Sequence, residues 1–167
     1  MLTHLASAVV RTEGLAELTQ TLSVAARWLD SWGGEVFPRV AEDAILRRNA
    51  LNGFADRMAV VDGVRRAPIL SHPQLGPLSI RDIEVCHGSA RSGRGASRRV
   101  MDEAQINGLL AASTLEDLQA LSGRLDEAIR SLESIEESMR SQGWHSGRTG
   151  IRCSFDATRA DAEKANE

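Results

Sequence analysis

The sequence contains no tyrosine, only three phenylalanines and three tryptophans, and one lysine among its 20 basic residues. So few aromatic residues disfavour a β-sandwich or barrel, because strands draw heavily on aromatic and β-branched side chains. The net charge of -3 gives no overall basic field, so nucleic acid is not an expected partner. No apolar run approaches the length of about 18 residues that a transmembrane helix needs, so we expect no direct membrane insertion.

Signals for secretion, disulfides and metals are also missing. Residues 1–10 are largely apolar but have no basic start, so a secretory signal is not expected. Cys86 and Cys153 stand alone and form no Cys-x-x-Cys pair. The four histidines are scattered, whereas a metal site needs about four ligands at suitable spacing. These absences predict a cytoplasmic protein with reduced thiols and with no cofactor or metal.

What remains is a composition and a periodicity typical of helices. Apolar residues make up 42% of the chain, and Ala, Leu, Arg and Glu dominate. Residues 2–10 predict a short helix, with Thr12 as the cap of the next one. The second helix follows from an apolar stripe with helical spacing, formed by Leu15, Leu18, Leu22, Ala25, Leu29 and Trp32. Gly33 and Gly34 end it, and Pro38 marks the break.

The middle of the chain predicts shorter elements. Residues 42–66 predict one or two helices, with Ile45, Leu46, Leu51 and Phe54 on one buried face and Met58, Val61 and Val64 on another. Residues 67–78 hold three of the four prolines and predict a loop, with a small hairpin at most. Ser79 is placed to cap a short helix over 80–85.

The last part predicts a helical hairpin over 100–142, packed on the first part of the chain. Residues 88–99 carry no large apolar residue and predict a flexible loop. A helix over 100–112 is followed by a capping box, Ser113 to Glu116, and then by a long helix over about 115–142. Its heptad-spaced apolar residues, called the seam below, are Leu118, Leu121, Leu125, Ala128, Leu132, Ile135 and Met139. We expect the seam to pack on 100–112; the alternative is pairing with a foreign helix. Residues 143–167 predict a polar tail.

Two further signals favour plain structural roles. Residues 88–94 nearly spell a phosphate-binding loop, but Arg94 stands where that loop needs lysine and Gly95 where it needs Ser or Thr. Cys86 and His87 are adjacent, which rarely lets a base reach a nucleophile. An enzyme with a nucleotide or thiol site around 86–95 is therefore only the less favoured hypothesis.

Trp28 and Trp32 are expected in the core, although an exposed indole there would be a candidate protein-binding anchor.

Five strings in the first half together resemble a known family. They are Arg11 to Leu15, Trp32 to Pro38, Asn49 to Asp56, Arg66 to Leu70, and Gly76 to Glu84. Their order and spacing over about residues 1–87 are similar to the ImpA-related N-terminal domain of TssA proteins of bacterial type VI secretion systems. The sequence departs from the family pattern at Gly33-Gly34, which looks like an insertion, and in its short acidic loop at 41–43. The family's C-terminal ring-forming region has no counterpart here, so ring assembly is not assumed.

The periodicity and the resemblance together predict an all-α fold, a compact multi-helix domain over about 1–87 followed by the helical hairpin with its long heptad-patterned helix. The resemblance implies a non-enzymatic scaffold or adaptor that assists baseplate and tube or sheath assembly in the cytoplasm. Its partners would be other type VI secretion proteins, with self-association possible. No catalytic residues carry over from the family. The motif positions that do are Glu13, Gly14, Trp32, Arg81 and Asp82. The rival reading is a generic helical adaptor that uses the 115–142 helix.

Overall fold

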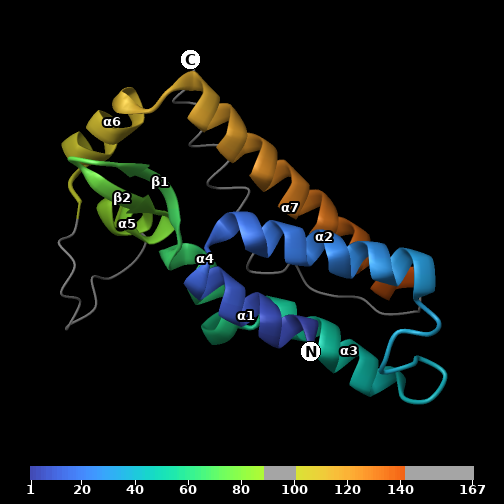
Figure 1. Cartoon of the computed structure of the whole chain (residues 1–167). Coiled ribbons are helices and arrows are strands. Elements are labelled where there is room, and N and C mark those ends of the chain that lie inside the picture. The colour runs from blue at the N-terminus through green and yellow to red at the C-terminus, as the bar shows by residue number, and fades with distance from the viewer. Residues whose placement is uncertain (89–100, 142–167) are drawn as a thin grey trace.

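The computed structural model describes residues 1–88 and 101–141. The predicted 88–99 loop, apart from Gly88, and the predicted 143–167 tail lie outside the described residues. The chain begins with two antiparallel helices, α1 (Leu2–Thr12) and α2 (Leu15–Trp32) (Figure 1). Thr12 is the last residue of α1, so its predicted role as the cap of α2 is wrong. That position belongs to Gly14, whose φ of 90° allows the tight turn between the two helices.

The long helix α7 (Leu115–Ser141) runs along α2, which lies between α7 and α1 (Figure 1). Every residue of the seam is buried, as the heptad spacing predicts. The expected partner of the seam, residues 100–112, is wrong, because α7 packs mainly on α2. The stripe of α2 carries the same 3-4 apolar spacing as the seam, so the two surfaces can interdigitate along their length. Helix α6 (Glu103–Ala112) contacts strand β1 instead.

The caps of α6 and α7 explain where these helices begin. Asp102 and Gln105 form a reciprocal capping box at the start of α6. The predicted box at the start of α7 lies one residue further along, because Ser113 ends α6. Thr114 Oγ1 accepts from the Asp117 amide at 3.1 Å, and the Asp117 carboxylate accepts from the Thr114 amide at 3.2 Å.

Residues 44–66 form a broken series of short turns. These are α3 (Ala44–Asn52), the 3-10 helix η1 (Gly53–Ala55), one π-helical turn η2 (Arg57–Val61), and α4 (Asp62–Arg66). The predicted burial of Ile45 and Leu46 is wrong: α3 turns Arg47 inward and leaves both of them exposed. Met58 is likewise exposed, because the π turn changes the helical register before Val61.

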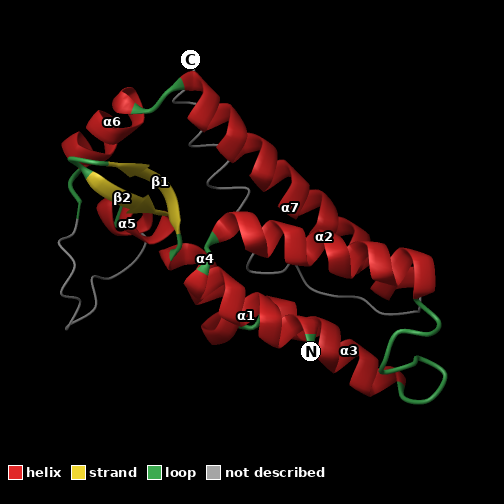
Figure 2. Cartoon of the chain, viewed as in Figure 1, coloured by secondary structure: helices red, strands yellow, loops and turns green. Residues whose placement is uncertain are grey.

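A small hairpin and a short helix complete the fold at the end away from α3 (Figure 2). Strands β1 (Pro68–His72) and β2 (Gly76–Ser79) pair antiparallel, with Leu70 opposite Leu78. Ser79 caps α5 (Ile80–Cys86), as the sequence predicts. The fold is mostly α, with this hairpin as its sheet within the described residues, so the predicted fold class is confirmed.

Two contacts show how tightly the short elements are fixed. A Cβ added at Gly63 in α4 would lie 2.6 Å from a methyl carbon of Val10 in α1, so only glycine allows this approach. Arg65 and Glu84 form a two-pronged ion pair between α4 and α5, with Nε to Oε2 at 2.8 Å. The hydrogen bond to Glu84 raises the pKa of Arg65.

Candidate protein-binding site

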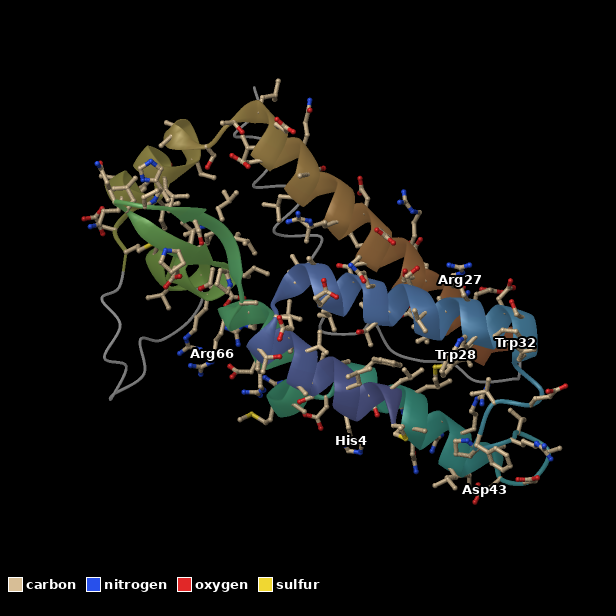
Figure 3. All side chains as sticks on the ribbon, in the orientation of Figure 1. His4, Arg27, Trp28, Trp32, Asp43 and Arg66 are labelled. Atoms are coloured by element: carbon tan, nitrogen blue, oxygen red, sulfur yellow. The ribbon has the colours of Figure 1, made fainter. Side chains whose placement is uncertain are left out.

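Three aromatic side chains are exposed where α2 ends. The exposed fractions are 43% for Trp28, 56% for Trp32 and 69% for Phe37. Figure 3 shows both indoles at this end of α2, beside the loop that leads to Asp43. The expectation that the tryptophans belong to the core is therefore wrong. Residues 33–43 turn away from α2 and reach α3, so nothing from this segment covers the indoles fully.

Beside these aromatics lies a pocket of about 300 Å³, which we call the Arg47 pocket. Its walls come from the first turn of α1, the end of α2, the 36–38 loop, α3 and η1. The wall is apolar except for Thr3 and one charged residue, Arg47. The lining residues are Met1, Leu2, Thr3, Ala25, Trp28, Leu29, Val36, Phe37, Pro38, Arg47, Ala50, Leu51 and Phe54.

Arg47 holds the loop that forms one wall of the pocket. The residue is only 1% exposed. Its guanidinium donates to the carbonyls of Val36, Pro38 and Gly33, the last two at 3.1 Å. Its Nε is buried and has no hydrogen-bond partner among the described residues. Burial lowers the pKa of Arg47, which stays a cation at any physiological pH.

A second hollow of about 450 Å³ continues from the Arg47 pocket, and the two share Leu2. It runs between α1 and α2, and we call it the α1–α2 groove. On α1 it is lined by three aliphatic residues followed by a glutamate, and on α2 by three polar residues followed by a valine. The lining residues are Leu2, Leu5, Val9, Glu13, Glu17, Gln20, Thr21 and Val24. Leu5 is 48% exposed and Val24 40%, so the middle of the groove offers uncovered aliphatic surface.

Charge divides along these two hollows. Glu13 and Glu17 stand together at the far end of the groove, both exposed, and neither forms an ion pair within residues 1–88 and 101–141. Arg47 stands at the opposite end, and its acceptors in the described structure are carbonyls and no carboxylate. The surface is therefore negative at one end, aliphatic in the middle, and aromatic over a buried cation at the other end.

The predicted motif residues do not gather in one place. Glu13 lines the α1–α2 groove, next to Gly14 in the turn, and Trp32 lies at the other end of α2. Arg81 and Asp82 lie on α5, near the hairpin (Figure 1). Asp82 accepts from the Ser79 amide at 2.9 Å and from its hydroxyl at 2.6 Å, so this carboxylate completes the cap of α5.

The described residues give little support to the alternative hypothesis of an enzyme site around 86–95. Cys86 is a half-buried free thiol at the end of α5, His87 is exposed, and residues 89–95 lie outside the described residues. The part of the chain that the structure describes holds no cluster of His, Cys, Asp and Glu that fits a metal ion. Nor does it hold a helix whose length and hydropathy would let it cross a membrane.

Sequence reasoning missed most of the groove and the pocket. A signal for the groove was available: Val24 and Trp28 lie outside the stripe of α2 and share a face with Glu17, at spacings of 7 and 4. A second, partly apolar face of one helix indicates a second contact. No comparable signal marked Arg47, because arginine in a short helix is normally solvated.

Comparisons with known proteins give a match of fold. No family model and no curated protein matches the chain. A solved structure matches with a TM-score of 0.73 and 18% sequence identity, over 98% of this chain and 69% of that one. It is the N-terminal domain, including the conserved ImpA_N region, of the TssA component of the type VI secretion system from Burkholderia cenocepacia. The chain therefore has the fold of that TssA domain, which confirms at the level of fold the resemblance carried by the sequence motifs.

Proposed function

We propose that this chain is a scaffold or adaptor module of a type VI secretion apparatus and acts through its surfaces, without catalysis. Its partners would be baseplate, tube or sheath proteins, and its place of work the cytoplasm. Two observations support the proposal. The fold matches the TssA domain over 98% of the chain, and the motif strings lie in the same order as in that family.

The observation that carries the interaction role is the uncovered apolar surface at α1 and α2. Trp28, Trp32 and Phe37 lie beside an open apolar pocket. Exposed aromatic anchors next to a pocket are typical of protein-binding surfaces, where tryptophan contributes most to affinity. Two half-exposed indoles on one helix face leave apolar area in contact with water, and a partner protein would bury that area.

The rival adaptor mode, in which the 115–142 helix binds a foreign helix through its seam, has less support. The seam is already packed on α2 within the chain. A foreign helix would have to displace α2 before it could reach Leu125 or Leu132, and the buried leucines would lose their packing.

The test uses a bacterium that carries this gene and a type VI secretion system. The gene is deleted, and sheath assembly is followed with a fluorescent sheath protein while release of the tube protein is measured. We expect fewer sheaths and less released tube protein, restored by the wild-type gene. Normal sheath numbers and release in the deletion strain would refute the proposal, provided that no second copy of the gene is present.

A further inference from the structure

We propose that the α1–α2 groove and the Arg47 pocket together bind one amphipathic helix of a partner protein, in a single orientation. The basic end of that helix lies over Glu13 and Glu17. At its other end, a bulky apolar side chain beside an acidic residue enters the Arg47 pocket. The inference rests on the proposed function in one respect, that the chain is a protein-binding module.

The shape of the surface favours a helix. The groove lies between two antiparallel helices, and its lining residues recur at helical spacing on each wall; the aliphatic ones lie mostly on α1, with Val24 on α2. A third helix laid between two others can place its side chains into such a groove, with the axes about 8–10 Å apart. From Glu17 in the groove to Trp28 in the Arg47 pocket, the combined surface follows α2 for about 17 Å, which matches about three turns of a partner helix.

The charges fix the orientation. Glu13 and Glu17 have no cation partner within the described residues, so a lysine or arginine placed over them would meet both carboxylates. At the other end, Arg47 is 1% exposed, its Nε has no partner, and its positive charge faces no carboxylate in the described structure. A carboxylate brought in beside an apolar anchor would supply the missing negative charge. The reversed helix would bring like charges together at both ends.

The binding partner can be found by placing a photo-crosslinking amino acid at position 24 of the full chain, in cells that express the secretion apparatus. We expect adducts with one segment of another protein, a helix with a basic residue two to three turns from an apolar–acidic pair. The same amino acid at Arg130, exposed on α7, should not give this adduct. Adducts only with a second copy of this chain, only within the chain, or none at all would each overturn the inference.

A synthetic peptide of the crosslinked segment then allows affinity to be measured with the full chain by fluorescence anisotropy. Val24→Asp should weaken binding at least tenfold. Leu75→Asp is the matched control, because Leu75 in the hairpin turn has the same 40% exposure and lies far from the groove; it should leave Kd within twofold. Equal Kd values for the two variants would refute the inference.

A second variant tests the charges even if Val24→Asp folds poorly. Glu13→Lys with Glu17→Lys changes two exposed side chains, so folding should be preserved. We expect Kd to rise about tenfold at low salt and by less at high salt, since salt screens exposed charges. An unchanged Kd at low salt would refute the proposed orientation.

These tests separate the inference from the proposed function. An adduct with the expected helix in a protein unrelated to secretion would leave the inference intact and remove the proposed function. A strain that carries Val24→Asp and assembles sheaths normally, where the deletion strain does not, would do the reverse.

Discussion

Replacing Arg47 with methionine tests whether the buried guanidinium holds the aromatic end of the molecule in place. Methionine keeps the unbranched stem of the side chain about as far as Nε, and removes the three hydrogen bonds to the carbonyls of Gly33, Val36 and Pro38. A hydrogen bond to a charged group contributes about 1.5–3 kcal/mol. Part of the stability lost with these hydrogen bonds is regained, because the folded protein no longer has to desolvate a buried cation, which costs several kcal/mol. We therefore expect Arg47→Met to lower the free energy of unfolding by about 2–4 kcal/mol.

Unfolding in urea, followed by far-UV circular dichroism, measures the effect on stability. At about 2–4 °C per kcal/mol for a chain of this size, the loss equals a decrease in Tm of roughly 4–16 °C. Arg130→Met, at an exposed position on α7, is the control and should change stability by less than about 0.5 kcal/mol. If Arg47→Met is as stable as the wild type or more so, desolvation outweighs the three hydrogen bonds, and the argument for Arg47 as the support of the loop fails.

Three further predictions concern the helices. Leu125→Ala should lower the free energy of unfolding in urea by about 2–5 kcal/mol, since Leu125 is fully buried. Light scattering should give the same mass for this variant as for the wild type; a changed mass would mean that the seam joins two chains. Gly63→Ala should destabilise by about 1–3 kcal/mol through overpacking, while Gly123→Ala, with open space around it in α7, should stabilise by about 0.5–1 kcal/mol; equal urea midpoints would contradict both. The hydroxyl and amide of Thr114 lower the pKa of Asp117, so this carboxylate stabilises the fold above its unfolded pKa and stops doing so as pH falls through its folded pKa. Thr114→Ala should raise that pKa in an NMR titration, and an unmoved pKa would refute the cap.

The sequence was most informative where one physical cause acts alone. The stripe of α2 and the seam of α7 each follow from the 3.6-residue period, and their residues are buried as predicted, except Trp32. Ser79 begins α5 because its side chain accepts from the Asp82 amide, which is a local interaction. Such elements need no knowledge of the rest of the chain.

Predictions failed where distant groups compete with local pattern. The helical spacing predicts that Ile45 and Leu46 are buried. Arg47 turns inward instead, because three carbonyls of the 33–38 loop need hydrogen-bond donors. The predicted partner of the seam was also wrong. Apolar spacing shows that a helix has an apolar face, but it does not show which other helix covers that face. The Arg47 pocket depends on the inward turn of Arg47, so periodicity alone could not reveal this part of the candidate site.

The packing of α7 on α2 also has a consequence for synthesis of the chain on the ribosome. Helix α2 is complete at Trp32, but the part of α7 near Leu132 is made about 100 residues later. At about 5–20 residues per second, α2 waits roughly 5–20 s for α7, the helix that packs along it. During that interval the nascent chain presents an apolar helix face of the kind that chaperones bind, and a pause in translation before residue 115 would lengthen it.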